Sequence, residues 1–351
     1  MKLALLLLKN LPEELAHSLA LGGLKFLYKL KILNLFIKKP NNNEFRLLGM
    51  NFKNKLGTAA GLDKNGDYID SLGALGFGFL EVGTVTPLPQ PGNDRPRLFR
   101  IFDEKAIINR MGFNNKGVDH LVKNLNNINY DGVVGVNIGA NKNSKGQKRI
   151  DDYLFCFKKV FNLADYIVIN ISSPNTPKLR SLHNNEKITE LIDAIKKRRA
   201  EKKSNVPIIL KVSPDIEEDK IEGICNILLE KSMDGVILTN TTIRNKNSLS
   251  SEHRIQDGGL SGEPLNEISN KIIQKFYLRL GRSIPIIGAG GVSSGATAYE
   301  KIKSGASLLQ LYTALIYEGP YVAKKINKEL SNLIKLNGYN NISEVIGINC
   351  K

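Results

Sequence analysis

Several apolar runs in this chain end in amides, hydroxyls or a lysine, which are groups that can hold a planar anionic ligand. In residues 166–180, YIVINISSPNTPKLR, the run is interrupted by Asn170 and gives way to two serines, two prolines and a second amide, Asn175. In residues 207–214, PIILKVSP, the run contains Lys211, although an unpaired ammonium is costly in an apolar strand. A single polar strand end is usually a turn, whereas several together indicate the wall of a binding site.

The other runs end in the same way. Their last residues, in chain order, are Gly61-Leu62-Asp63-Lys64, Thr84, Asn137, Asn170, Lys211, Thr239-Asn240-Thr241, Gly290-Gly291 and Tyr312-Thr313. No histidine and no pair of carboxylates occurs at the last five of these ends, which argues against a glycosidase and against a Ser-His-Asp triad. Amides with two lysines instead suit a polar anionic substrate and a phosphate-bearing cofactor that carries the difficult chemistry.

The elements that carry these residues must bring them to one place. The eight runs cover residues 55–61, 79–86, 133–140, 166–173, 207–214, 235–242, 285–291 and 307–314. Helix-compatible segments separate the runs, and this alternation indicates parallel strands that are buried on both faces. It predicts an α/β fold, a closed (β/α)8 TIM barrel, whose active site lies at the C-terminal ends of the strands. An open doubly wound sheet is the alternative, disfavoured because no G-x-G-x-x-G follows the first run.

The end of the seventh run, GAGG, favours a phosphate site. Glycines let backbone N–H groups approach an anion closely, and the phosphate site of many barrels lies after strands seven and eight. Tight turns need glycines too. The position of Gly290 and Gly291 at the end of the seventh run, with Tyr312 and Thr313 at the end of the eighth, is what favours a phosphate site.

The composition is that of a soluble globular protein with an excess of basic residues. The 351 residues include 50 Lys and Arg against 34 Asp and Glu, a net charge of +16. Such a surface suits nucleic acid, anionic lipid or an anionic small molecule, and a lysine-rich solvated surface explains it equally well. Metal-ligand spacing is missing, because the cysteines and histidines are scattered at Cys156, Cys225, Cys350, His17, His120, His183 and His253. We expect no metal site, reduced thiols, and helical positions for the first two cysteines.

The first 43 residues form a separate segment in our interpretation. Leu15, Leu19, Phe26 and Leu30 recur at helical spacing and define one apolar face. The pair at 22–23, Gly-Gly, predicts a break into two helices. An apolar face with lysine flanks suits a membrane interface, and packing against the main domain is an equal alternative. No run approaches the roughly 20 apolar residues that span a bilayer. The polar break PNNN predicts the boundary between residues 1–43 and a domain of residues 44–351.

At the predicted strand ends the chain resembles the class 2, quinone-dependent dihydroorotate dehydrogenases. The resemblance runs nearly end to end and rests on NKLGTAAGLDKNG, EVGTVTPLPQPGNDRPRLFR, NRMGFNN, GVNIGANK, NISSPNTP, LKVSPD, TNTT, GGLSGEPL, PIIGAGGV and GASLLQLYTALIYEGP. It implies an FMN-containing barrel with an N-terminal helical extension. The implied reaction oxidises (S)-dihydroorotate to orotate in de novo pyrimidine biosynthesis and passes the electrons to a membrane quinone.

The resemblance also implies roles for individual residues. The positions that match contacts to the flavin ring, with the motif residues beside them, are Ala59, Ala60, Gly61, Leu62, Asp63, Thr84, Asn137, Asn170, Lys211 and Thr239. Those that match the ribityl chain and phosphate are Gly262, Gly290, Gly291, Tyr312 and Thr313. Those that match the substrate ring, its carboxylate and the loop beneath it are Lys64, Asn109, Arg110, Met111, Gly112, Phe113, Asn170, Asn175, Asn240 and Thr241.

Ser173 matches the catalytic base, which takes a proton from substrate C5 while hydride passes from C6 to flavin N5. A neutral serine is a poor base, so a water relay or strict positioning must help it. Ser172 points the other way by strand alternation and is expected to be structural. Lys211 would stabilise negative charge on the reduced ring, and Pro174 and Pro177 would restrain Asn175.

His17 and Arg100 match positions near the quinone. The N-terminal helices would form its apolar entrance and contact an anionic lipid surface. We therefore expect peripheral attachment to the cytoplasmic side of the inner membrane, with no transit peptide. We also expect no nucleic-acid partner and a monomer or weak oligomer.

Three other functions compete with this interpretation. A class 1 dihydroorotate dehydrogenase, which uses fumarate or NAD, has a cysteine base and no N-terminal extension, but no cysteine falls at a strand end here. A flavin barrel that reduces uridine in tRNA would need a catalytic cysteine and a C-terminal RNA-binding domain. A basic module that binds nucleic acid or a membrane surface would leave the polar strand ends unexplained.

Overall fold

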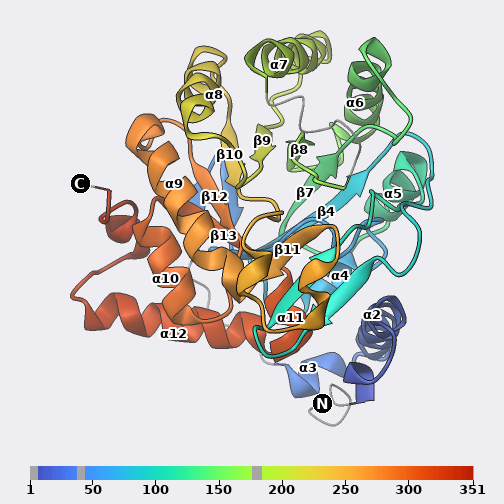
Figure 1. The fold of residues 1–351 in the computed structure, drawn as a ribbon, viewed down its shortest axis with the longest axis vertical. Coiled ribbons are helices and arrows are strands. Elements are labelled where there is room, and N and C mark those ends of the chain that lie inside the picture. Colours follow the sequence, from blue (N-terminus) through green and yellow to red (C-terminus); the bar gives the residue numbers. More distant parts are fainter. Residues whose placement is uncertain (1–6, 38–43, 176–183, 351) are drawn as a thin grey trace.

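A closed barrel of eight parallel strands forms the centre of the molecule (Figure 1). The computed structural model describes residues 7–37, 44–175 and 184–350. In barrel order the strands are β3 (Leu56–Thr58), β4 (Phe79–Val85), β7 (Val133–Ile138), β8 (Tyr166–Asn170), β9 (Ile208–Val212), β10 (Gly235–Leu238), β12 (Ile286–Ala289) and β13 (Ala306–Leu311). Each lies within or beside one of the eight predicted runs. The predicted (β/α)8 fold is therefore confirmed.

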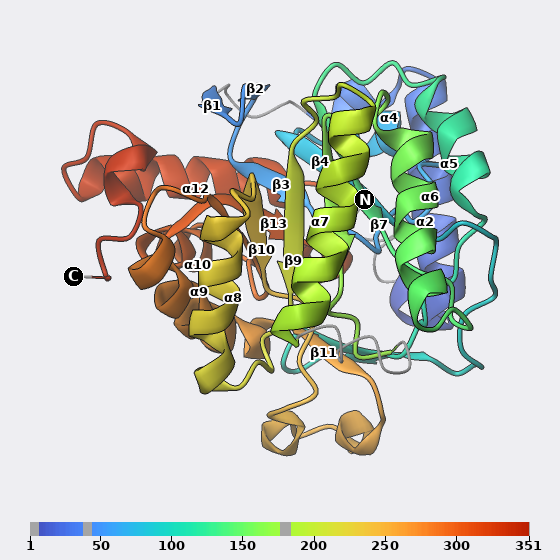
Figure 2. The same ribbon diagram turned by 90° about the horizontal axis from the view of Figure 1, so that it is seen from above.

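Helices cover the outside of the barrel (Figures 1 and 2). They are α4 (Ile69–Gly73), α5 (Val118–Leu125), α6 (Gln147–Val160), α7 (Asn185–Glu201), α8 (Glu218–Glu230), α9 (Asn266–Leu280), α10 (Gly295–Lys303), α11 (Thr313–Glu318) and α12 (Val322–Leu336). Each longer helix turns an apolar stripe to the strands, as α5 does with Val118, Leu121 and Leu125. Cys156 and Cys225 are buried in α6 and α8, so their predicted helical positions are confirmed.

A short hairpin closes the N-terminal end of the barrel. It consists of β1 (Phe45–Leu47) and β2 (Met50–Phe52), and Figure 2 shows it at the end opposite β11. The ring of Phe52 packs edge-to-face on Phe79 at 5.4 Å between centroids, beneath the buried ring of Tyr166. Because the hairpin covers the N-terminal end, a ligand can enter the barrel only from its C-terminal end.

A second sheet, not predicted from the sequence, lies across that open end. Its antiparallel strands are β5 (Leu98–Ile101), β6 (Ala106–Asn109) and β11 (Gly259–Gly262), with β6 in the middle. The pairing of β6 with β11 places Asn109 opposite Gly259. Residues 150 positions apart in the chain therefore meet above the barrel.

The N-terminal extension packs beside α4 and β5 as α2 (Glu13–Lys29) and α3 (Leu33–Phe36). The predicted break at residues 22–23 is wrong, because α2 runs through both glycines without interruption. Each glycine costs the helix only about 1 kcal/mol, and burial of its inner face, including Ala16 and Leu21, offsets that cost. The predicted domain boundary at residues 40–43 lies outside the described residues.

The predicted apolar face of α2 points away from the barrel. Leu15, Leu19, Phe26 and Leu30 are 48%, 51%, 62% and 49% exposed. This face is therefore about half or more open to solvent, while the helix itself packs on α4 and β5 through its other side. No helix in the described parts of the chain has both the length and the hydropathy to cross a bilayer.

Candidate active site

A cavity opens at the C-terminal end of the barrel, under the second sheet. Most of the predicted site residues line it: Ala59, Ala60, Gly61, Lys64, Thr84, Asn109, Met111, Gly112, Phe113, Asn170, Ser173, Asn175, Lys211, Thr239, Asn240, Thr241, Gly262, Gly290, Gly291, Tyr312 and Thr313. Six predicted residues are not part of its lining: His17, Leu62, Asp63, Arg100, Arg110 and Asn137. The barrel thus brings residues from seven of the eight strand ends together, and the end of β7 does not reach the lining.

A buried carboxylate, Glu81 on β4, lies below the cavity floor. Its Oε1 atom accepts a hydrogen bond from Asn137 Nδ2 (2.9 Å) and lies 3.6 Å from Lys211 Nζ. Its Oε2 atom accepts hydrogen bonds from Gln310 Nε2 (2.6 Å) and the Tyr166 hydroxyl (3.3 Å). The negative charge of Glu81 explains how Lys211 is tolerated inside the barrel. Sequence reasoning missed Glu81, although a glutamate within FLEVGTV is a visible signal.

Three polar side chains above Glu81 are bonded to one another. The Thr84 hydroxyl donates to Asn137 Oδ1 (2.6 Å), and Asn170 Nδ2 donates to Thr84 Oγ1 (2.8 Å) and Asn137 Oδ1 (3.2 Å). Asn137 is fully buried behind the other two. It therefore orients Thr84 and Asn170, which reach the cavity.

The two adjacent serines of NISSPNTP have different surroundings. Ser172 is buried outside the lining, and its hydroxyl donates to Asn170 Oδ1 (3.2 Å) and accepts from Asn240 Nδ2 (2.9 Å). Ser173 lines the cavity, where its hydroxyl accepts a hydrogen bond from the Asn175 backbone N–H (3.3 Å). Among the described residues, no histidine or carboxylate bonds to Ser173. Pro177 lies outside the described residues.

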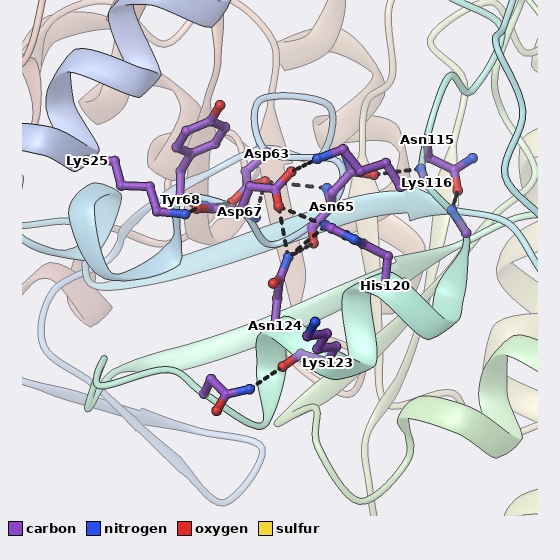
Figure 3. Close-up of polar contacts among 12 residues, drawn as sticks. Lys25, Asp63, Asn65, Asp67, Tyr68, Asn115, Lys116, His120, Lys123 and Asn124 are labelled. Atoms are coloured by element: carbon purple, nitrogen blue, oxygen red, sulfur yellow. Dashed lines mark hydrogen bonds and ion pairs between the residues drawn. The ribbon is translucent and has the colours of Figure 1, made fainter.

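Lys64 lies in the loop between β3 and α4, and Figure 3 shows the hydrogen bonds made by its neighbour Asp63. The carboxylate of Asp63 points into the loop and accepts the backbone N–H groups of Asn65 (3.3 Å), Asp67 (3.0 Å) and Tyr68 (2.7 Å). Burial raises the pKa of Asp63 to about 6. Burial also lowers the pKa of Lys64 to about 8. Asp63 therefore shapes the loop, and Lys64 presents the charge to the cavity.

The same loop is clamped from α5. The carboxylate of Asp67 accepts from Lys116 Nζ (2.9 Å) and Asn124 Nδ2 (3.0 Å) and lies 2.8 Å from His120 Nε2 (Figure 3). On its other side, Lys25 of α2 donates to the Asp67 carbonyl oxygen (2.8 Å). These contacts fix the backbone on which Lys64 stands.

Two amides meet on the opposite wall. Asn175 Nδ2 donates to the backbone oxygen (3.0 Å) and side-chain oxygen (3.2 Å) of Asn109, and Asn109 Nδ2 donates to the Gly259 carbonyl (3.3 Å). Arg110 turns away, because its guanidinium stacks over the Phe99 ring at 4.8 Å. Of the predicted NRMGF loop, Arg110 alone is missing from the cavity lining.

Glycines form the other end of the cavity. Gly262, Gly290 and Gly291 have φ values of 101°, 106° and 74°, which side chains rarely adopt. A Cβ atom at Gly262 would lie 2.3 Å from the Lys105 carbonyl oxygen. These positions therefore require glycine, and the missing side chains let an anion such as a phosphate approach the backbone N–H groups.

Two buried polar atoms at the cavity have no hydrogen-bond partner among the described residues. They are Thr239 Oγ1 and Gln310 Oε1, and both side chains line the cavity. Unpaired buried polar atoms are costly, so these two fit a ligand with matching polar edges. A flavin ring has such edges, and the glycine-rich end fits the phosphate of a flavin nucleotide. Gln310 was not predicted from the sequence.

His17 and Arg100 lie where α2 meets the barrel. Burial lowers the pKa of His17 to about 4, and Lys64 contributes to the same effect. The imidazole is therefore neutral at neutral pH. Arg100 donates to the backbone oxygens of Leu8 (3.0 Å) and Leu11. Neither residue reaches the main cavity, so their predicted contact with a quinone stays a prediction.

The family model for dihydroorotate dehydrogenase matches residues 43–334. This chain belongs to the dihydroorotate dehydrogenase family. A relative from Marinobacter nauticus, named Dihydroorotate dehydrogenase (quinone), is 48% identical over 93% of this chain and 98% of its own length. A relative of the same name from Vibrio cholerae is 47% identical over 92% of this chain and 97% of its own. The prediction of class 2 membership is confirmed.

Solved structures agree with the family assignment. A ligand-free dihydroorotate dehydrogenase from Eimeria tenella is 36% identical and superposes with a TM-score of 0.87 over 96% of this chain and 99% of its own. A complex of the Eimeria tenella enzyme with ferulenol is 34% identical, with the same TM-score, over 96% of this chain and 95% of its own.

The described residues of this chain contain no cluster of three or more histidine, cysteine or acidic side chains that could hold a metal ion. Its three cysteines lie outside the cavity lining. A cysteine base, which the class 1 alternative requires, is therefore missing from the cavity.

Proposed function

We propose that this chain oxidises dihydroorotate to orotate in the barrel cavity, with FMN as the primary electron acceptor and a membrane quinone as the final one. The observation that carries the proposal is the meeting of Ser173, Lys64 and the two amides Asn109 and Asn175 in one cavity. The relatives named Dihydroorotate dehydrogenase (quinone), which match nearly the whole chain, support both the substrate and the acceptor.

The substrate is held by charge and hydrogen bonds. Lys64 offers an ammonium to the carboxylate of dihydroorotate, while Asn109, Asn175, Asn240 and Thr241 offer amide and hydroxyl groups to its ring and carboxylate. The Asn109–Asn175 hydrogen bonds fix both amides before the substrate arrives. Such preorganisation reduces the entropy that binding must lose.

Ser173 removes the proton from substrate C5. Its hydroxyl has no charged partner among the described residues, so its proton must leave through water or through close contact with the substrate. The buried Ser172 holds Asn170 and Asn240 from behind. This arrangement supports the assignment of the base to Ser173 rather than Ser172.

FMN would be held by Thr239, Gln310 and Lys211 around its ring and by Gly262, Gly290 and Gly291 at its phosphate. When bound, it supplies the hydride acceptor for substrate C6. Glu81 fixes the position of Lys211 at 3.6 Å, so that the ammonium can stabilise negative charge on the ring. Thr84, Asn170, Ala59, Ala60, Gly61, Tyr312 and Thr313 complete this predicted site.

The exposed face of α2 would rest on an anionic lipid surface and admit the quinone near His17 and Arg100. Leu15, Leu19 and Phe26 are about half exposed or more, and such a face gains free energy by entering the acyl boundary. We assign the protein to the cytoplasmic side of the inner membrane, as a monomer or weak oligomer without a nucleic-acid partner.

A comparison of electron acceptors tests this proposal. The purified protein should be yellow and should oxidise dihydroorotate with a soluble quinone analogue but not with fumarate or NAD. A colourless protein, or one that is active with fumarate alone, would refute the assignment.

A further inference from the structure

Helix α2 is joined to the loop before β5 by a bidentate ion pair. Arg97 Nε donates to Glu14 Oε1 (2.8 Å) and Arg97 Nη2 donates to Glu14 Oε2 (3.0 Å). Arg95 adds a third hydrogen bond to Oε2 (3.1 Å). The side chain of Arg97 is only 6% exposed and that of Glu14 is 23% exposed, so this pair is shielded far more than an ordinary surface ion pair.

The same guanidinium shapes the loop that it belongs to. Arg97 Nη1 donates to the carbonyl oxygens of Pro91 (2.6 Å) and Asn93 (2.7 Å). The loop is pressed against the chain segment of the substrate amides, because a Cβ atom at Gly92 would lie 2.3 Å from the Met111 carbonyl oxygen. A shift of Arg97 must therefore move Asn93.

Asn93 in turn contacts both chain segments that carry the substrate amides Asn109 and Asn175. Its Nδ2 atom donates to the carbonyl oxygens of Asn175 (3.2 Å) and Arg110 (2.9 Å). A Cβ atom at Gly112 would lie 2.8 Å from the Asn93 side chain. Asn175 then bonds to Asn109. A continuous set of contacts runs from α2 to the two amides of the cavity.

We propose that Glu14, Arg97 and Asn93 form a relay that positions Asn175, so that α2 sets the affinity for substrate as well as the contact with lipid. This inference rests on the proposed function. Glu14 and Arg97 touch no substrate and are positioning residues. The relay makes the helix that faces the membrane part of the substrate site, and by linkage, substrate binding stabilises the docked helix.

Removal of the Glu14 carboxylate should weaken the relay at its start. In Glu14→Gln a neutral amide with one acceptor oxygen replaces the carboxylate, so the buried guanidinium of Arg97 loses its bidentate charged partner and the loop loses its fixed point. We expect Glu14→Gln to raise the Kd for orotate about tenfold, the scale of a charged hydrogen bond. The KM for dihydroorotate should rise similarly, while kcat and FMN content should stay near wild type.

The matched control is Glu13→Gln, which removes the neighbouring acid from the same first turn of α2. The Oε1 atom of Glu13 lies 3.7 Å from Nε of Arg100, so Glu13 pairs with Arg100 and not with Arg97. The measurement is titration of the full-length, FMN-loaded enzyme with orotate, followed by the flavin absorption and without quinone. We expect Glu13→Gln to bind orotate like wild type. Equal Kd changes in both variants would assign the effect to helix charge and overturn the relay.

A second variant tests the far end of the relay and serves if Glu14→Gln does not fold. Asn93→Ala keeps the Glu14–Arg97 pair but removes the contact to Asn175, and should also raise the Kd for orotate about tenfold. The double variant should be no weaker than Asn93→Ala alone, because both changes act on one chain of contacts. Wild-type Kd values in the single variants, or additive losses, would overturn the relay. A wild-type enzyme that does not bind orotate would instead refute the proposed function.

Discussion

At the scale of residues, the cavity separates two serines that the sequence places side by side. Ser172 supports Asn170 and Asn240 from behind, whereas Ser173 faces the cavity with a hydroxyl that has no charged partner among the described residues. The surrounding amides are held by one another, so water and positioning must assist Ser173.

Replacement of Ser173 tests its role as the base. Ser173→Ala should slow flavin reduction by dihydroorotate at least about a hundredfold, the usual scale of acid–base catalysis. Orotate binding should change little, because the hydroxyl is not a principal binding group. Rapid mixing without oxygen measures the reduction rate. Ser172→Ala is the control, and a larger loss in that variant would show that the base has been assigned to the wrong serine.

The charge of Lys64 predicts a pH dependence of substrate binding. Burial lowers the pKa of Lys64 to about 8 in the free enzyme. Below that pH the ammonium attracts the substrate carboxylate, and above it the neutral amine does not. Affinity for orotate should therefore fall as the pH rises above about 8. The bound anion favours the charged form, so the midpoint in the complex should be higher. Titration with orotate across this pH range measures the effect. If Lys64→Met showed the same dependence of the Kd on pH as the wild-type enzyme, the prediction would be contradicted.

At the scale of elements, the apolar runs predicted all eight barrel strands because strands buried on both faces carry few polar residues. Most of the residues predicted at the strand ends also line the cavity. Glu81 was missed because it lies inside a strand, where only its partners Lys211, Asn137 and Gln310 make a carboxylate acceptable. No local pattern shows those partners.

Other elements depend on contacts that the local sequence does not contain. The sheet of β5, β6 and β11 pairs short strands far apart in the chain. The break predicted at residues 22–23 was wrong because packing of the inner face of α2 outweighs the low helix propensity of two glycines. Asn137 was expected at the flavin but lies behind Thr84 and Asn170. How far a side chain lies from the cavity depends on the closure of the barrel, which the local sequence does not show.

A glycine in β7 provides a test of the barrel packing. A Cβ atom at Gly135 would lie 2.0 Å from Cζ of the Tyr166 ring, whose hydroxyl bonds to Glu81. Gly135→Ala should therefore destabilise the protein by about 1–3 kcal/mol. Gly22→Ala in α2 is the control, because its Cβ meets no atom within 4 Å, and it should be neutral or stabilising. Thermal unfolding should give Gly135→Ala a lower melting temperature than Gly22→Ala. Equal melting temperatures would contradict this prediction.

At the scale of the whole molecule, one helix combines an exposed apolar face with contacts to the loop that carries Lys64 and to the loop that carries Asn93. Lys25 bonds to the loop of Lys64, and Glu14 bonds to the loop of Asn93 through Arg97. We propose that the outer face of α2 contacts lipid. In that proposal the quinone enters next to the substrate cavity, because α2 contacts the loop of Lys64.

Membrane attachment through α2 can be measured directly. Leu19→Ser combined with Phe26→Ser should weaken binding to vesicles with anionic lipid at least about tenfold, because both exposed side chains lose apolar area. Flavin reduction by dihydroorotate should be unaffected. Ile255→Ser combined with Leu278→Ser is the control, since these residues are 81% and 63% exposed on other elements. Equal vesicle binding by both double variants would refute attachment through α2.

The central claim is that one cavity oxidises dihydroorotate and delivers its electrons to a quinone. Its most direct test is to mix the flavin-loaded enzyme with dihydroorotate in the absence of oxygen and then to add a quinone. We predict that the yellow absorption is lost as orotate forms in equal amount, and that it returns with quinone but not with fumarate. Flavin that stays oxidised in the presence of dihydroorotate, or that fumarate alone reoxidises, would contradict the claim.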